Sequence, residues 1–355
     1  MRSQRVSPDQ IASGGDGPLA GAVLLAPIRL GERTIPKGTR LDPALGAAIV
    51  RAVRDGALTA PLRLGWAEAG DLHEDDAALT LARAVAGPGL VIGPPRQSRV
   101  DLTARTDGVL RVNVEALARI NRVDPLEVFS LFHGQSVRAG QPVASAKVAP
   151  HLVPGAAVAA GAAVAQAATP VVDVVPYLPL EVAAIAAEPL ADGALTRFDA
   201  AARAKVTSLG GCFTGTTLVP EEDVAAAAAH LTALLTRLAA RPVALVLVGG
   251  VSAGDPLSPM FEALDALGGT VLRRGVPAHP GSMIWLARLG ETTLLGLPQC
   301  GMFSMATAAD LVLPRLLTGE RVTADTLADL GHGGMLGREM RFRFPDYARD
   351  LEAPE

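Results

Sequence analysis

Residues suited to holding an anion directly follow one strongly apolar stretch of the chain. The run from Val243 to Val248 contains only Val, Leu and Ala, and it ends in a loop of small and polar residues: Gly249, Gly250, Ser252, Gly254 and Asp255. Glycine amides can approach an anion closely because no Cβ intervenes, and a helix N-terminus adds positive potential. We therefore predict a strand, a phosphate-sized loop and then a helix that begins at Asp255-Pro256.

Asp255 itself has two interpretations. A carboxylate at the mouth of an anion site can hold a metal ion or a polar group of the ligand. Alternatively, Asp255 caps the helix, with Pro256 in its first turn, since both residue types are favoured there. This segment alone leaves both interpretations open.

The composition excludes several classes of protein. The 355 residues are 49% hydrophobic and carry a formal net charge of −4, so the basic surface typical of nucleic-acid binding is missing. Cys212 and Cys300 are too few for a disulfide scaffold, which favours a reducing compartment. Residues 1–17 lack the apolar core of a secretory signal. We expect a cytoplasmic protein without a nucleic-acid or membrane partner.

The order of apolar and turn segments predicts the α/β class and five regions. These are a disordered N-terminus (1–17), a β-rich α+β region of one or two subdomains (18–150), an Ala- and Pro-rich linker or helix (151–178), an α/β domain (179–335) and a C-terminal tail (336–355). Strands alternate with helices in the α/β domain, which indicates three α/β/α layers around a mostly parallel sheet. Ligands bind beyond the carboxyl ends of such strands, so the loops at Gly249, Pro280 and Pro298 should converge.

Four segments of the α/β domain carry a family resemblance. They are Gly249-Gly-Val-Ser-Ala-Gly-Asp255, Leu267-Gly-Gly, Pro280-Gly281-Ser282 and Gly296-Leu297-Pro298. In their order and spacing, the region from Glu181 to Met335 resembles the molybdopterin-binding domain shared by Mog, MoeA and gephyrin. Asp199, in Thr196-Arg-Phe-Asp199, resembles the acidic residue that precedes the first long helix of that family. The front half is similar to a companion region in molybdopterin-binding proteins that accompany molybdenum hydroxylases.

The chain also departs from the family pattern. Ala186-Ala187-Glu188-Pro189 stands where the family usually has Thr-Gly-Asp-Glu, and Gln299-Cys300-Gly301 replaces Gly-Asn-Pro after Gly-Leu-Pro. His279 stands in place of a lysine. Backbone amides can still hold an anion after such changes, but adenylyl transfer or metal insertion needs charged groups at fixed places. The departures therefore question catalysis more than binding.

The resemblance implies a site for molybdopterin or the finished molybdenum cofactor. The residues expected to bind it are Gly249, Gly250, Ser252, Gly254, Pro280, Gly281, Ser282, Gly296, Pro298 and Cys300. Asp255 and Asp199 are the expected catalytic pair, and they would also hold magnesium. Their alternative roles are ordinary ones, because aspartate often caps helices, serine often occupies turns and a free cysteine is often a small buried residue.

Three functions remain open from the sequence. The chain binds the pterin and acts in cofactor biosynthesis, maturation or delivery to a recipient molybdoenzyme; or it is a magnesium-dependent molybdopterin adenylyltransferase or molybdenum-insertion enzyme; or it is a non-catalytic interaction module that has lost the ligand. The resemblance also implies a homo-oligomer. The acidic run from His73 to Asp76 is interpreted as a helix start, since adjacent residues do not share a helical face.

Overall fold

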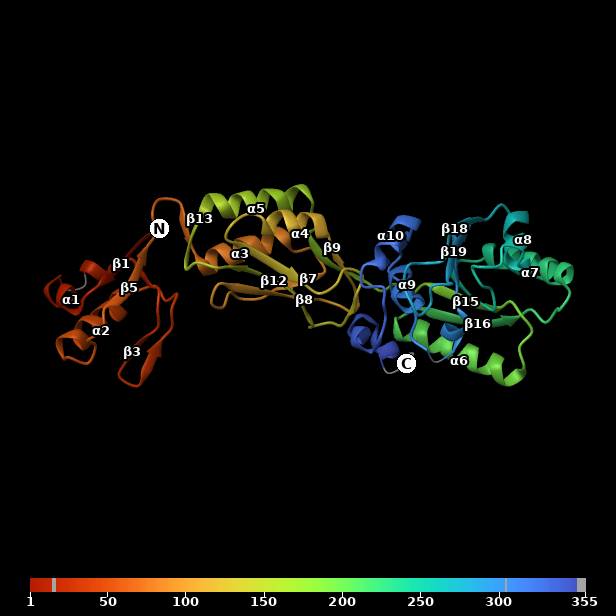
Figure 1. Ribbon diagram of the computed structural model, residues 1–355, viewed down its shortest axis with the longest axis horizontal. Coiled ribbons are helices and arrows are strands. Elements are labelled where there is room, and N and C mark those ends of the chain that lie inside the picture. Colours follow the sequence, from red (N-terminus) through yellow and green to blue (C-terminus); the bar gives the residue numbers. More distant parts are fainter. Residues whose placement is uncertain (15–16, 304, 350–355) are drawn as a thin grey trace. The chain divides into compact units, whose positions relative to one another are not determined.

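The computed structural model describes residues 1–14, 17–303 and 305–349, and it divides the chain into two compact units (Figure 1). The first unit contains Met1–Arg105, Arg111–His133 and Ala139–Val174. The second contains Thr106–Leu110, Gly134–Arg138 and Val175–Glu355. The chain therefore passes between the units at several places.

The N-terminal segment is folded, so the prediction of disorder over residues 1–17 was wrong for the described part of it. Strand β1 (Arg2–Val6) pairs antiparallel with β5 (Leu62–Trp66), and helix α1 (Pro8–Gly14) buries Ile11 completely. Only Val6 of β1 is buried, which is why the strand has no recognisable apolar alternation. Residues 15 and 16 lie outside the described residues.

Polar N-cap residues begin two further helices of the first unit, α2 (Pro43–Arg54) and α4 (Val114–Asn121). The Asp42 side chain accepts a hydrogen bond from the Leu45 amide at 2.7 Å, and helix α2 begins directly after it. Asn113 caps α4 in the same way. The other elements up to the second unit are β2 (Ala22–Leu24), β3 (Ile28–Leu30), β4 (Arg33–Ile35), α2 (Pro43–Arg54), β6 (Asp71–His73), α3 (Glu74–Val85), β7 (Leu90–Ile92), β8 (Arg99–Ala104), β9 (Gly108–Val112), α4 (Val114–Asn121), β10 (Leu126–Ser130), β11 (Ser136–Val137), β12 (Pro142–Val148), β13 (Leu152–Pro154), α5 (Gly155–Ala167) and β14 (Val172–Pro176).

The uncharged stretch after Leu152 contains one helix, α5. A Cβ on Gly161 would lie 2.3 Å from Cδ1 of Leu126, so the small residues of α5 permit close packing against its neighbours. A search of the described residues for a helix with the length and apolar character needed to cross a membrane finds none.

The second unit is built on a six-stranded sheet. Its strand order is β16 (Cys212–Leu218), β15 (Glu181–Ala186), β17 (Val243–Gly249), β20 (Thr292–Gly296), β19 (Trp285–Leu289), β18 (Thr270–Arg274). The first four strands are parallel, and β19 and β18 are antiparallel to their neighbours. The carboxyl ends of β15, β17 and β20 therefore meet at one edge of the sheet.

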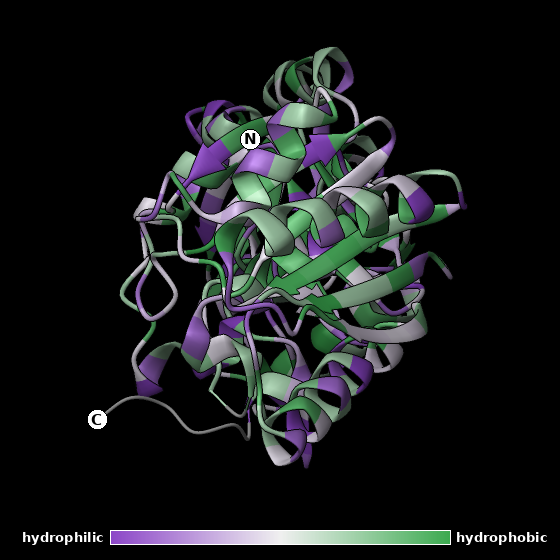
Figure 2. Cartoon of the chain, turned by 90° about the vertical axis from the view of Figure 1, so that its right-hand side faces the viewer, coloured by the Kyte–Doolittle hydropathy of each residue, from purple (hydrophilic) through white to green (hydrophobic). Residues whose placement is uncertain are grey.

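Helices cover both faces of this sheet. On one face, α6 (Asp192–Ser208) and α9 (Ala309–Leu316) pack on the alternate residues Val182, Ala184 and Ala186 of β15. On the other, α7 (Val224–Ala239) and α8 (Pro259–Ala266) pack around Ala183 and Ile185. Figure 2 shows hydrophobic colouring along the central strands. The unit is thus a three-layer α/β/α domain with a mostly parallel sheet, as predicted.

Helix α8 begins later than the sequence had indicated. Its N-cap is Ser258, whereas Asp255 and Pro256 lie in the preceding turn. The Asp255 Oδ1 atom accepts a hydrogen bond from the Leu257 amide at 3.0 Å, which stabilises that turn instead of a helix. Three residues therefore separate Asp255 from the helix that it was expected to open.

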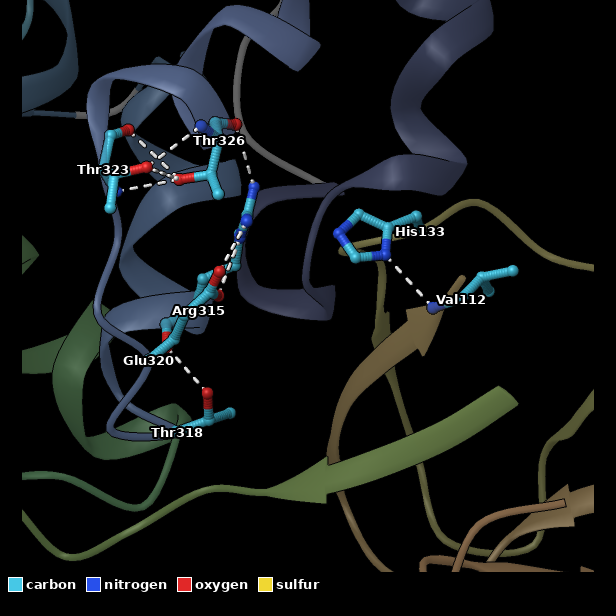
Figure 3. Close-up of polar contacts among 7 residues, drawn as sticks. All are labelled: Val112, His133, Arg315, Thr318, Glu320, Thr323 and Thr326. Carbon is cyan, nitrogen blue, oxygen red and sulfur yellow. Dashed lines mark hydrogen bonds and ion pairs between the residues drawn. The ribbon is translucent and has the colours of Figure 1, made fainter. Parts of the chain in front are cut away.

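A buried ion pair fastens α9 to the elements after it (Figure 3). The Arg315 guanidinium, 3% exposed, donates to both carboxylate oxygens of Glu320, at 2.9 and 2.6 Å, and to the carbonyl of Thr326 at 3.4 Å. The elements that complete the chain are η2 (Gln299–Met302), α10 (Ala324–Ala328), η3 (Asp329–Gly331), η4 (Arg338–Arg343) and α11 (Asp346–Arg349). The predicted C-terminal tail is therefore folded through Arg349, and Phe344 is buried in the same core as β15.

Candidate ligand-binding site

Three loops enclose a cavity of about 530 Å³ at the carboxyl edge of the parallel strands. The loop after β17 contributes Gly250 and Ser252, the turn before β19 contributes Gly281 and Ser282, and the loop after β20 contributes Pro298 and Cys300. These six residues were expected to bind a ligand, and the structure brings them to one cavity. Its volume lies in the range of pockets that hold small organic molecules.

Four other residues of the predicted set lie next to the residues that line the cavity. A Cβ on Gly249 would lie 2.5 Å from Cε of Met302, and one on Gly296 would lie 2.1 Å from Nε1 of Trp285. Pro280 is buried, and Gly254 leaves room for the end of Met283, which lines the cavity. These residues permit close packing, and they are not among those that line the cavity.

Gly250 and Gly281 both have backbone conformations that exclude a side chain. Their φ angles are +84° and +100°. A Cβ on Gly250 would lie 2.6 Å from Cγ of Glu188, and one on Gly281 would lie 2.7 Å from the amide nitrogen of Ala308. A larger residue is therefore strained at both positions by its φ angle, and it would also displace the Glu188 side chain at position 250 or contact the Ala308 backbone at position 281.

A buried tryptophan is hydrogen-bonded to the loop after β17. Trp285 is 1% exposed, and its Nε1 donates to the carbonyl of Val251, a cavity residue, at 3.0 Å. Phe261 of α8 contacts the indole edge to face, with ring centroids 5.0 Å apart. The loop that was expected to bind phosphate therefore lies on a rigid aromatic base.

The predicted catalytic pair does not line the cavity. Asp199 lies within α6, and its carboxylate accepts from Arg203, one turn further along the helix, at 3.2 Å. Asp255 is exposed in its turn. In the described parts of the chain, no three His, Cys, Asp or Glu residues form a group that could hold a metal ion.

Glu188 is the acidic residue that lines the cavity, and the sequence analysis had treated it only as part of a departure from the family pattern. It follows the end of β15 by two residues, so it lies at the same sheet edge as the Gly250 loop. Among the described residues, no hydrogen bond or ion pair joins the side chains of Glu188, His279, Ser282 or Cys300 to another part of the protein. These polar groups are available to a ligand.

The described residues of the lining combine polar and apolar surfaces and include no lysine or arginine. Met283, Leu297 and Pro298 provide apolar surface, and the serine hydroxyls and the backbone around Gly250 can form hydrogen bonds. Hydrogen bonds to an anion would therefore come from neutral donors.

Comparison with known proteins finds a structural similarity but no family for this chain. No protein-family profile matches the chain, and no curated protein matches it. Among solved structures, the molybdopterin biosynthesis MoeA protein from Pyrococcus horikosii is similar at 14% sequence identity and a TM-score of 0.28, covering 70% of this chain and 74% of that chain.

Proposed function

We propose that the second unit binds molybdopterin, or the molybdenum cofactor formed from it, and that the protein acts in maturation or delivery of that cofactor. One observation carries this proposal: the loops that the sequence predicts to bind molybdopterin surround one cavity, in which the side chains of Glu188, His279, Ser282 and Cys300 have no partner among the described residues. Delivery implies a recipient molybdoenzyme.

The chemistry of the ligand matches the lining group by group. The terminal phosphate would accept hydrogen bonds from the backbone at Gly250 and from the Ser252 hydroxyl. The flat pterin would lie against Met283 and Pro298. Its amino and ring N–H groups need an acceptor, and the Glu188 carboxylate supplies one.

The catalytic alternative has less support from the geometry. Adenylyl transfer or metal insertion would use magnesium, and neither Asp199 nor Asp255 lines the cavity that would hold the pterin. Among the described residues of the lining, Glu188 supplies the one carboxylate. We therefore propose binding as the function of the site.

The direct test is anaerobic calorimetry with molybdopterin, together with Trp285 emission in a Trp66→Phe background. We expect saturable 1:1 binding, and Glu188→Gln should weaken it about tenfold because a charged acceptor becomes a neutral one. Asp199→Asn is the control, since it removes a carboxylate outside the cavity lining. Formation of an adenylylated product with MgATP would favour the enzyme. No binding to the unmodified protein would leave the interaction module as the better description.

A further inference from the structure

The C-terminal segment, defined here as residues 331–349, is attached to the loop that forms one wall of the cavity. The amide of His279 donates to the carbonyl of Gly334 at 2.7 Å, and the amide of Leu336 donates to the carbonyl of His279 at 2.8 Å. His279 lines the cavity and directly precedes Pro280-Gly281. One end of the segment is thereby hydrogen-bonded to this wall.

The other end of the segment reaches a buried carboxylate. The Tyr347 hydroxyl donates to Oδ1 of Asp310 at 2.9 Å, and Lys205 forms an ion pair with the same oxygen. Asp310 and Lys205 are 1% and 4% exposed. Buried charges of this kind require complete hydrogen bonding, so the Tyr347 hydroxyl helps to stabilise the buried carboxylate of Asp310.

Asp310 in turn fixes the backbone behind the cavity. Its Oδ2 atom accepts from the amide of Thr307 at 2.8 Å, which holds the turn before α9. The next amide, that of Ala308, donates to the carbonyl of Pro280 at 2.8 Å. A Cβ on Gly281 would lie 2.8 Å from Cβ of Thr307, so the wall and this turn are in direct contact.

Tyr347 serves as a hydrogen-bond donor over the whole useful pH range. Burial raises the pKa of its hydroxyl well above the ordinary value, and the negative charge of Asp310 raises it further. The hydroxyl therefore stays protonated. Hydrogen bonds from Tyr347 and Thr307 to Asp310, and from Ala308 to Pro280, thus connect Tyr347 to the turn that carries Gly281 through the backbone of residues 307–308.

We infer that Tyr347 is a positioning residue for the cavity: its hydroxyl, acting through Asp310, holds the wall formed by residues 279–283 in the shape that accepts a ligand. The ligand part of this inference rests on the proposed function, whereas the effect on the wall does not. The C-terminal segment is then a component of the site, although none of its residues lines the cavity.

The chain offers a matched pair of variants for the test. The sequence contains two tyrosines, and Tyr347→Phe and Tyr177→Phe each remove one hydroxyl group. The Tyr177 hydroxyl donates to Oγ of Ser136 at 2.9 Å, and not to Asp310. Hydrogen exchange in the ligand-free protein is measured by mass spectrometry on peptides that cover residues 276–284. We expect about tenfold faster exchange there in Tyr347→Phe, since loss of such a hydrogen bond costs about 1.4 kcal/mol locally, and no change in Tyr177→Phe.

Binding then separates the two proposals. Molybdopterin affinity, measured well below the unfolding temperature of both variants, should fall about fivefold in Tyr347→Phe and stay unchanged in Tyr177→Phe. A purely structural hydroxyl would lower the unfolding temperature without changing the affinity of the folded protein. If the unmodified protein does not bind, the proposed function fails while the exchange result still decides the effect on the wall. Equal exchange in the two variants would overturn the inference.

Discussion

The two units each contain a polar cavity, and the two cavities differ in how their charges are used. The first unit has a cavity of about 420 Å³ lined by Lys37, Arg40 and the run from His73 to Asp76. Its acidic groups are already paired: Glu74 with His151 at 2.6 Å, and Asp76 with Arg40. In the second unit, the described side chains of Glu188 and Ser282 have no such partners. The unpaired carboxylate of Glu188 therefore distinguishes the second cavity from the first, whose carboxylates Glu74 and Asp76 are paired.

The paired charges of the first cavity follow from local structure. His73 is the N-cap of α3, its Nδ1 accepts from the Asp75 amide at 3.2 Å, and its Nε2 is bonded to the carbonyl of Gly38 at 2.8 Å. A Cβ on Gly38 would lie 2.0 Å from Oε1 of Glu74, so this loop is closely packed on the carboxylate. The acidic run is a helix start, as the sequence predicted.

Removal of a paired charge from the first unit tests whether that charge serves stability and not ligand binding. Glu74 is 3% exposed, and Glu74→Ala leaves His151 and the Gly38 loop without their partner. We expect a loss of about 3 kcal/mol in unfolding free energy and no change in molybdopterin binding. Urea unfolding followed by Trp66 in a Trp285→Phe background measures the first unit alone. The exposed Glu115→Ala is the control, and an affinity loss in Glu74→Ala would show that the cavities are not independent.

The converse change is made at the second cavity. In Gly250→Ala, the new Cβ would lie 2.6 Å from Cγ of Glu188 and displace the carboxylate proposed to bind the pterin. We expect about tenfold weaker molybdopterin binding and a loss of about 1 kcal/mol in stability from the positive φ angle. Gly290→Ala shares the positive φ, +57°, but has open space around its Cβ, so it should lose the stability and keep the affinity. Equal affinities in the two variants would exclude Gly250 from the site.

The fold of the second unit could be predicted from the sequence because its apolar segments and turn segments follow one another in a regular order. β17 (Val243–Gly249) matches the predicted apolar run from Val243 to Val248, and parallel pairing with β15 and β20 then places their loops at one edge. Glycine turns were informative for the same reason, since only glycine meets the demands at Gly250 and Gly281. Motifs that depend on backbone shape were therefore recognisable without a structure.

Side-chain contacts made by tertiary packing were not recognisable in this way. Asp199 was expected to precede its helix, but α6 begins at Asp192. Asp199 therefore lies within the helix, one turn before Arg203 on the same face, and the two side chains form an ion pair. Glu188 was passed over because its neighbours depart from the family pattern, although its distance from the end of β15 predicts its location. Folding of β1 depends on its pairing with β5, which lies about 60 residues away in the sequence and leaves no local pattern.

A smaller effect tests whether the first unit uses its other charges in the same way. Asp101 accepts from the Ser145 hydroxyl at 2.6 Å and from Arg99, and these contacts lower the pKa of its carboxyl. A lowered folded pKa contributes stability that is fully present above the ordinary value of 3.8 and is lost as the pH falls through the folded value.

Asp101→Asn should therefore destabilise the first unit at pH 7 and have a smaller effect at about pH 3, below the ordinary pKa of 3.8. Because the carboxylate is 42% exposed, solvent screens the interaction, and we expect a difference of about 0.5 kcal/mol. Urea unfolding followed by Trp66 at the two pH values measures it, with the exposed Asp9→Asn as the control. A difference that stays constant with pH would mean that Asp101 acts through shape and not through its charge. The comparison between paired and unpaired carboxylates would then hold for Glu74 alone, where burial enforces the pairing.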